Sequence, residues 1–184
     1  MSQAEFLKKI FAELERLGIA AMLVGSHASS FYGEARTTHD IDIVIDLPAE
    51  KIPKLIQAFP APRYYLSEIA LREGRMANLI DTDSGDKADF FILGNDPSRR
   101  SELDRRQKQT VMGSPVFLAT PEDTIVAKLR WSVESGGSER QIQDVQHMVA
   151  VQAERLDRDF IQRRLLEDGL PQQWQLVSDM LERS

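Results

Sequence analysis

Two aspartates separated by a single residue, Asp40 and Asp42, form the pair in this sequence that is best suited to chemistry. They lie in a segment, residues 40–46, in which acids or valine alternate with isoleucines. Such alternation predicts a strand with both carboxylates on one face, about 6.5–7 Å apart along the backbone. Mg²⁺ prefers carboxylate oxygens, and two-metal sites hold their ions about 3.5–4 Å apart. The pair therefore suits divalent metal, although an isolated pair of this kind is more often an exposed acidic strand face.

A glycine–serine pair, Gly25-Ser26, offers a possible phosphate contact. It follows an apolar run, residues 19–24, and precedes a short predicted helix over residues 27–32. The first N–H groups of a helix and the positive end of its dipole attract phosphate, and a glycine allows close approach. The alternative is an ordinary tight turn between a strand and a helix, which is the commoner reason for this pair.

A third aspartate, Asp89, lies in an otherwise apolar segment, residues 87–93, which predicts a buried strand. An acid in such a strand needs a cation or a metal as its partner, because burying an unpaired charge is costly. A salt bridge is the simpler explanation for this residue when it is taken alone.

The elements expected to position these residues form an α/β lobe with a small mixed sheet. Hydrophobic periodicity and turn residues predict the following helices and strands. The predicted helices cover residues 4–17, 27–32 and 49–58, and the predicted strands cover 19–24, 41–45, 76–81 and 88–93, with short strands around a turn in 111–118. A hairpin turn is expected at residues 84–86, whereas residues 63–74 have no clear pattern.

The second part of the chain is predicted to be entirely helical, over about 121–134, 139–152, 157–167 and 171–182. Thr120-Pro121-Glu122-Asp123 is a strong helix start, because it combines a capping hydroxyl, an early proline and acids in the first turn. The fold class is therefore α/β (α+β): a catalytic lobe over residues 1–119 is followed by a helical lobe over residues 120–184.

Composition limits the classes of protein to consider. The 184 residues include 42% hydrophobic residues and no cysteine, which excludes disulfides, thiolate metal sites and cysteine nucleophiles. No apolar run reaches the roughly 18–20 residues of a membrane span, and the first residues lack the pattern of a secretory signal. These features predict a cytoplasmic protein without a membrane partner.

The net charge of −6 argues against a nucleic-acid-binding domain driven by overall charge. A local basic segment is the best candidate for contact with a polyanion. It contains Arg99, Arg100, Arg105, Arg106 and Lys108. The alternative is a solvated helix face, because acids are interleaved with these residues.

Taken together, the motifs resemble the DNA polymerase β-type nucleotidyltransferase superfamily over roughly residues 5–150. The resemblance rests on Gly25-Ser26, then Asp40-Ile41-Asp42, then a third aspartate on a later apolar strand. The flanking sequences look like the AbiEii/MenT-type branch, which includes toxins of bacterial toxin–antitoxin and phage-defence systems. These sequences are Arg36–Asp42, Lys87–Phe90 and Pro121–Leu129.

The resemblance implies roles for individual residues. Asp40, Asp42 and Asp89 would bind two Mg²⁺ or Mn²⁺ ions, with Asp89 also the natural general base. Gly25, Ser26 and Lys128 would hold the phosphates of a nucleoside triphosphate. For Lys128 the alternative is a solvated helix lysine.

Three further assignments stay open between two explanations. Arg36 is expected either to contact phosphate or to pair with the acids. Asp144 resembles part of an Arg-x-x-x-Asp element with Arg140, and the alternative is an i, i+4 ion pair. His27 and His39 flank the motifs and are expected to be hydrogen-bond partners rather than metal ligands.

The resulting expectation is an enzyme that transfers a nucleoside monophosphate from a triphosphate to a hydroxyl acceptor. The acceptor is a tRNA end, a protein or a small molecule, and a cognate antitoxin is a possible partner. The main alternative is a catalytically silent protein of the same fold that binds a nucleotide or a partner chain. An antitoxin-like or scaffolding role would need an exposed apolar stripe on the last helices, for which six residues are available: Leu165, Leu166, Leu170, Trp174, Val177 and Leu181.

Overall fold

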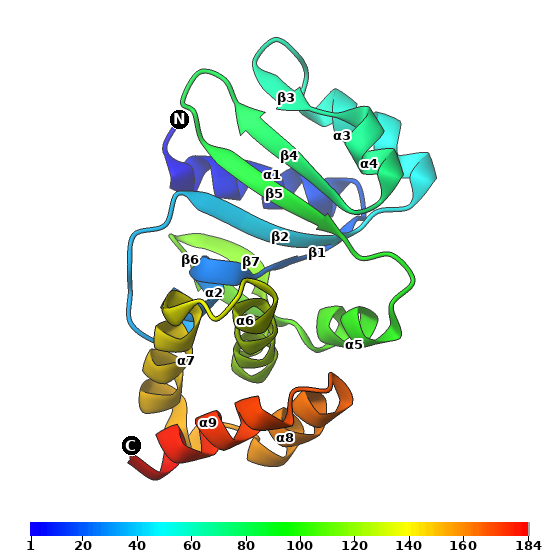
Figure 1. Cartoon of the computed structure of the whole chain (residues 1–184). Coiled ribbons are helices and arrows are strands. Elements are labelled where there is room, and N and C mark those ends of the chain that lie inside the picture. Colours follow the sequence, from blue (N-terminus) through cyan, green and yellow to red (C-terminus); the bar gives the residue numbers. More distant parts are fainter. Residues whose placement is uncertain (184) are drawn as a thin grey trace. The chain divides into compact units, whose positions relative to one another are not determined.

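One mixed β-sheet is the framework of the structure, a computed structural model that describes residues 1–183. Within these residues seven strands have the spatial order β3-β4-β5-β2-β1-β7-β6 (Figure 1). The strands are β1 (Ala20–Leu23), β2 (Asp40–Asp46), β3 (Tyr64–Leu66), β4 (Met76–Asp81), β5 (Lys87–Ile92), β6 (Gln107–Val111) and β7 (Ser114–Leu118). Strands β2 and β5 run parallel, as do β1 and β7, and the other neighbouring pairs are antiparallel. The mixed α/β fold class is confirmed.

Contacts divide the described chain into two units. The first unit contains residues 1–26 and 38–119, and the second contains residues 27–37 and 120–184. The short segment 27–37 is therefore grouped with the C-terminal helices, although it lies in the first third of the sequence. The division into a catalytic lobe over 1–119 and a helical lobe over 120–184 stays a prediction.

Four α-helices and one 3₁₀ turn of residues 1–183 accompany the sheet in the first unit. They are α1 (Gln3–Arg16), the 3₁₀ turn η1 (Ala49–Lys51), α3 (Ile52–Ala58), α4 (Glu68–Glu73) and α5 (Pro97–Arg105). Helix α1 begins with a capping box, in which Ser2 and Glu5 bond each other's backbone N–H groups, and it buries one apolar face. The predicted helices 4–17 and 49–58 are confirmed, and the unassigned stretch 63–74 contains β3 and α4.

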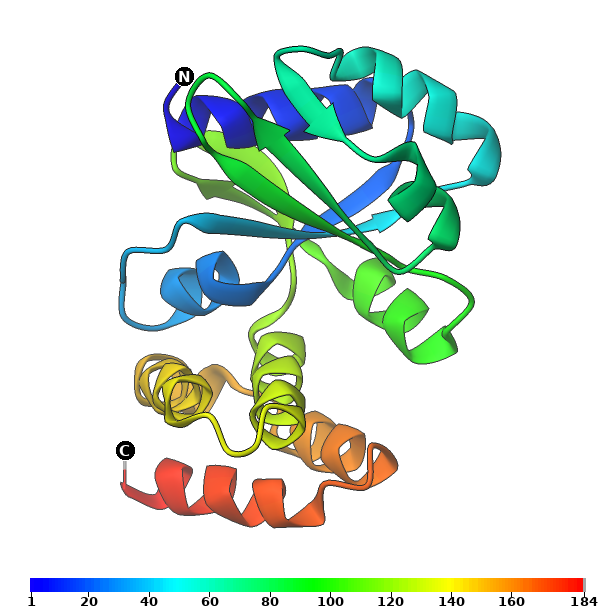
Figure 2. The same ribbon diagram turned by 45° about the horizontal axis from the view of Figure 1, so that its top comes forward.

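The two faces of the sheet have different side chains because residues in a strand alternate. Ile41, Ile43 and Ile45 of β2 are each 0% exposed. Figure 2 shows α1 and α3 on one side of the sheet and α5 on the other. Leu103 of α5 packs in a cluster with Met22, which is opposite Val44 in the strand register. Helix α5 thus lies on the side of Val44 and the aspartates, and α1 and α3 cover the isoleucines.

The second unit is helical. Helix α2 (Gly25–Tyr32) starts in the first unit, and the other elements are α6 (Pro121–Glu134), α7 (Glu139–Gln152), the 3₁₀ turn η2 (Ala153–Arg155), α8 (Arg158–Glu167) and α9 (Pro171–Arg183). Thr120 caps α6, with its hydroxyl accepting from Asp123 N at 3.1 Å. The end of α2 packs tightly on α7, since a side chain at Gly33 would approach Met148 N to 2.9 Å.

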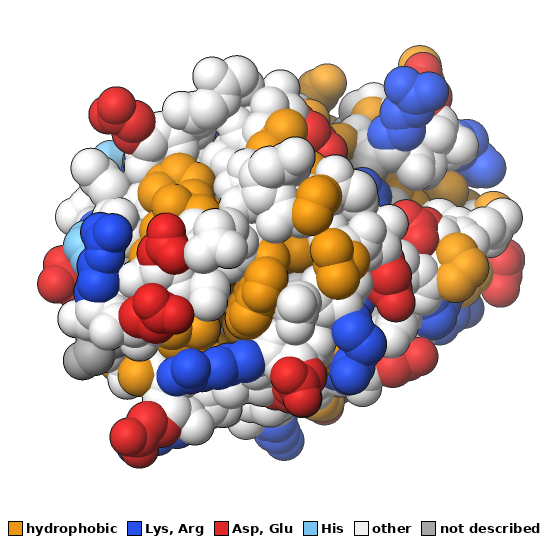
Figure 3. Space-filling view, turned by 60° about the horizontal axis from the view of Figure 1, so that its bottom comes forward, with side chains coloured by type: hydrophobic (Ala, Val, Ile, Leu, Met, Phe, Trp, Pro, Cys, Tyr) orange, Lys and Arg blue, Asp and Glu red, His pale blue; other side chains and the backbone are white. Residues whose placement is uncertain are grey.

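Three of the six residues that an apolar docking stripe would need are buried inside the second unit, and only one of the six is exposed. Leu165 and Val177 are 0% exposed and Leu181 is 7% exposed, whereas Leu166 is 53% exposed. The face of the molecule in Figure 3 shows hydrophobic side chains interspersed with charged ones. The last helices therefore use this apolar stripe mainly for their own packing. Across residues 1–183, no helix has both the length and the hydropathy of a membrane span.

Replacing Ile43 with alanine tests the assignment of the covered face. Core deletions of this size lower the free energy of unfolding by about 2–5 kcal/mol, so Ile43→Ala should do the same in urea denaturation. Ile69 of α4 is 72% exposed, which makes it a matched control. Ile69→Ala should change the free energy of unfolding by no more than about 0.5 kcal/mol. Equal losses in both variants would contradict the assignment.

Candidate active site

The parallel pairing of β2 and β5 brings the three predicted aspartates to one face of the sheet. Asp42 is opposite Asp89, and Asp40 is opposite Lys87. Neighbouring strands lie about 4.8 Å apart, and residues directly opposite each other share a face. The predicted strands 41–45 and 88–93 are confirmed, and the candidate metal ligands lie side by side as the sequence pattern requires.

Asp89 is held by two neighbours that the sequence analysis did not identify. Its Oδ1 accepts a short hydrogen bond from Asn78 Nδ2, and its Oδ2 lies 3.0 Å from Lys87 Nζ. Asn78 is directly opposite Asp89 on β4. The hydrogen bond with the Asp89 carboxylate is the main cause of a raised pKa of Lys87, so the ammonium stays charged. Each oxygen of this nearly buried carboxylate thus has its own donor.

Asp40 also contacts the Lys87 ammonium that bonds Asp89. Its Oδ1 lies 3.5 Å from Lys87 Nζ, and its side chain is 58% exposed. One lysine therefore contacts two carboxylates that come from adjacent strands. Such an arrangement reduces the repulsion between acids that the sheet places on one face.

Gly25 fits closely against Asp42. Its φ of +64° lies in the left-handed region, and an added Cβ would be 2.1 Å from Asp42 Oδ2. The residue before Gly25 is held close to the same aspartate, because Val24 N donates to the backbone oxygen of Asp42 at 2.9 Å. Only glycine adopts this positive φ without strain and also leaves room for the Asp42 carboxylate. The start of helix α2, with its N–H groups, therefore lies beside one of the three aspartates.

These residues fit a hard divalent cation. All three ligand candidates are carboxylates, which Mg²⁺ and Mn²⁺ prefer, and the Lys87 ammonium already lies between two of them as a positive charge. In the described part of the chain, no three His, Asp or Glu side chains are gathered closely enough to hold a metal ion as they stand. Binding a metal at this face therefore requires side-chain rearrangement around Asp40, Asp42 and Asp89.

A second charged cluster lies in the second unit around Asp144 of α7. Arg36 forms a two-pronged contact, with Nε 2.9 Å from Oδ1 and Nη2 2.9 Å from Oδ2. Lys128 Nζ of α6 is 2.6 Å from Oδ2, and Ser29 Oγ of α2 is 3.2 Å from it. These bonds connect α2, the segment after it, α6 and α7.

The charge balance of this cluster keeps Asp144 ionised. Burial alone would raise the pKa of Asp144, but the hydrogen bonds from Arg36 and Lys128 outweigh it and lower this pKa to about 2. Lys128 is 5% exposed, so the alternative of a solvated helix lysine is wrong. Across residues 1–183 no ion pair links Asp144 to Arg140, so the alternative of an i, i+4 pair is also wrong. The predicted nucleotide contacts of Arg36, Lys128 and Asp144 stay predictions.

His27 also lies in the second unit, and its Nε2 is buried without a hydrogen-bond partner. Burial, with a smaller effect of the Arg36 charge, lowers the pKa of His27 and favours the neutral imidazole. The predicted role of His27 as a hydrogen-bond partner is thus wrong for Nε2. The backbone carbonyl of His39 accepts from Gln3 Nε2 at 2.9 Å.

The basic segment is largely engaged within the first unit. Arg100 pairs with Asp46 at the end of β2, with Nη2 3.0 Å from Oδ1, and it thereby ties α5 to the sheet. Arg106 stacks on Phe117, 4.7 Å from the ring centroid. Contact of this segment with a polyanion stays a prediction, and at least these two arginines have structural roles.

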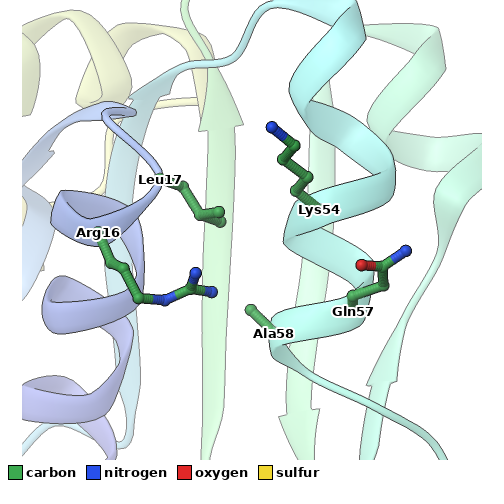
Figure 4. A pocket seen from close by; sticks show the side chains of 5 residues that line it. All are labelled: Arg16, Leu17, Lys54, Gln57 and Ala58. Carbon is green, nitrogen blue, oxygen red and sulfur yellow. The ribbon is translucent and has the colours of Figure 1, made fainter.

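A hollow of about 530 Å³ lies between α1 and α3 (Figure 4). Its lining residues are Arg16, Leu17, Lys54, Gln57 and Ala58. It is on the side of the sheet that carries the isoleucines and contains none of the predicted site residues.

Comparison with known proteins establishes the fold. No protein-family model and no curated protein matches the sequence. An antigenic nucleotidyltransferase-like protein from Paracoccidioides brasiliensis is similar in structure, with a TM-score of 0.62 and 18% identity over 98% of this chain and 92% of that chain. The antibiotic-resistance factor ANT(2'')-Ia has a TM-score of 0.56 and 14% identity over 98% and 95% of the two chains. The lincosamide antibiotic adenylyltransferase LnuA has a TM-score of 0.55 and 14% identity over 82% and 98%.

At these identities the likeness shows the fold, which is that of nucleotidyltransferases. The chain therefore has the fold that the superfamily resemblance implies, and membership of the superfamily stays a prediction. The AbiEii/MenT-type branch stays a prediction.

The acid dependence of stability tests the Asp144 cluster. Because the pKa of Asp144 is about 2 in the folded chain and 3.8 ordinarily, its ionised form stabilises the fold above about pH 4. This contribution disappears as the pH falls from about 4 to about 2. The difference in unfolding free energy between the wild type and Asp144→Asn should therefore shrink over that range. If the difference in unfolding free energy stayed constant from neutral to acid pH, Arg36 and Lys128 would not be stabilising the ionised form of Asp144.

A pair of glycine substitutions tests the contact with Asp42. Gly94 has a φ of +65° and no neighbour within 4 Å, so Gly94→Ala bears only the backbone cost of about 1–2 kcal/mol. Gly25→Ala has the same backbone cost and also displaces the Asp42 carboxylate. Chemical denaturation should show a larger loss of unfolding free energy for Gly25→Ala. If the two variants are equally destabilised, Asp42 does not lie against Gly25.

Proposed function

We propose that this protein is a metal-dependent nucleotidyltransferase, which moves a nucleoside monophosphate from a triphosphate to a hydroxyl acceptor. The observation that carries the proposal is the register of β2 and β5, which gathers Asp40, Asp42 and Asp89 on one sheet face. The start of α2 beside Asp42 adds backbone N–H donors suited to phosphate. The nucleotidyltransferase fold of the chain supports the same reaction class.

In the proposed reaction the acceptor oxygen attacks the α-phosphorus. A new phosphorus–oxygen bond forms, the bond to the β-phosphate oxygen breaks, and pyrophosphate leaves. Asp40, Asp42 and Asp89 would hold the metal. When bound, a divalent cation at this face supplies charge neutralisation and lowers the pKa of the attacking hydroxyl.

We assign Asp89 as the general base that takes the proton of the acceptor. Asn78 donates to its Oδ1, so the proton would go to Oδ2 after the Lys87 ammonium has left that oxygen. A fixed carboxylate is an efficient base, because less orientational freedom is lost when the acceptor hydroxyl arrives. Gly25 and Ser26 would orient the triphosphate through their backbone N–H groups, with the Ser26 hydroxyl as an additional contact.

For the acceptor we favour a small hydroxylated molecule. ANT(2'')-Ia is described as an antibiotic-resistance factor, and LnuA as an antibiotic adenylyltransferase with lincomycin bound. This chain spans 95% and 98% of those two chains, so its size suits an acceptor of that class. A tRNA end, a protein hydroxyl and a role as a toxin with a cognate antitoxin are tested in the same assay.

Transfer of label from each α-labelled triphosphate, with Mg²⁺ or Mn²⁺, tests the proposal. Aminoglycosides, lincosamides, total tRNA and cell extract serve as acceptors in parallel. Asp40→Asn, Asp42→Asn and Asp89→Asn should each lower transfer by at least about a hundredfold and keep the circular dichroism of the wild type.

Asp46→Asn is the matched control, because Asp46 is on the same face of β2 but pairs with Arg100. It should keep transfer within a few-fold of the wild type. Near-normal transfer by any of the three site variants would remove that residue from the site. Metal-dependent nucleotide binding without transfer to any acceptor would favour the catalytically silent alternative.

A further inference from the structure

Lys87 contacts the oxygens that the proposed function assigns to metal. It lies on β5 two residues before Asp89, and it is opposite Asp40 in the strand register. Its side chain therefore projects from the same sheet face as these carboxylates. The ammonium is 3.0 Å from Asp89 Oδ2 and 3.5 Å from Asp40 Oδ1.

An ammonium and a divalent cation compete for the same carboxylate oxygens. Asn78 already donates to Oδ1 of Asp89, so Oδ2 is the oxygen available to either cation. A metal that binds Asp40 and Asp89 together must take the position between them. Because like charges repel, Lys87 would also be pushed out by the arriving cation.

Lys87 is able to move its side chain away from the Asp40 and Asp89 carboxylates. Its side chain is 36% exposed, and four rotatable carbons connect its charge to the strand. A displaced ammonium would therefore reach water without disturbing the ladder between β2 and β5. The buried Lys128, 6% exposed in its side chain and bonded to Asp144, has no comparable exposure.

We infer that Lys87 is an internal counterion that occupies the metal position and is exchanged for the divalent cation. This inference rests on the proposed function, since it assigns Asp40 and Asp89 to the metal. Two consequences follow. The metal-free site is stabilised by the lysine, and the affinity of the site for free metal is lowered by it. Lys87 is a positioning residue, since it acts through the carboxylates.

Titration with Mn²⁺ in the absence of nucleotide, followed by electron paramagnetic resonance of the free ion, measures this competition. A charge-assisted hydrogen bond is worth enough to shift a dissociation constant about tenfold. Lys87→Met should therefore bind Mn²⁺ about tenfold more tightly than the wild type. Lys87→Arg, which keeps the charge, should stay closer to the wild type.

Lys8→Met is the matched control, because Lys8 is an exposed lysine of α1 in the same unit. It removes the same charge and should leave Mn²⁺ affinity unchanged. Thermal melting gives a second measurement. In EDTA, Lys87→Met should melt below the wild type, and Mn²⁺ should narrow the gap because it binds the folded variant.

The outcomes separate this inference from the proposed function. If the wild type binds Mn²⁺, Asp42→Asn loses binding and Lys87→Met binds no more tightly than the wild type, the metal site stands and the counterion role is overturned. If neither the wild type nor Lys87→Met binds Mn²⁺ without nucleotide, the counterion role is overturned, whereas the proposed function is decided by the transfer assay. Should Lys87→Met fail to fold, Lys87→Gln carries the same test.

Discussion

The parallel register of β2 and β5 is the constraint on which the rest of the site depends. It places Asp42 opposite Asp89 and Asp40 opposite Lys87. A slip of one residue would move the aspartates to the covered face and the isoleucines to the open one, at a large cost in buried charge. The apolar packing of Ile41, Ile43 and Ile45 therefore fixes the position of the carboxylates as firmly as any contact that they make themselves.

The neighbouring elements complete the site by backbone pairing. Strand β4 pairs with β5 so that Asn78 meets Asp89, and the end of β1 leads directly into Gly25 beside Asp42. Helix α5 is attached to the last residue of β2 by the ion pair between Arg100 and Asp46. The acids that could bind metal are thus positioned by paired strands, and the ion pair of Asp46 with Arg100 lies at the opposite end of β2 from Asp40.

Much of this arrangement was predictable from the sequence, because alternation and turn residues are local signals. The segment 40–46 and the turn at 84–86 predicted β2 and the hairpin. Lys87 could have been found from its spacing of two from Asp89, and Asn78 from the register of that hairpin. Strand β3 and helix α4 were missed because elements of three and six residues show too little periodicity. The pairing of Arg36 with Asp144, 108 residues apart, has no local signal.

The two charged clusters differ in a way that bears on their roles. Asp144 is bonded by two cations, Arg36 and Lys128, is 7% exposed and has a pKa of about 2, which is the compensation that a buried charge needs. In the other cluster Asp40 and Asp89 share one ammonium, and Asp40 is 58% exposed. A shared counterion and partial exposure to water compensate these carboxylates less fully than Asp144 is compensated. Incomplete compensation and exposure are what a carboxylate needs to exchange one cation for another, so the face of β2 and β5 suits cation binding better than the Asp144 cluster does.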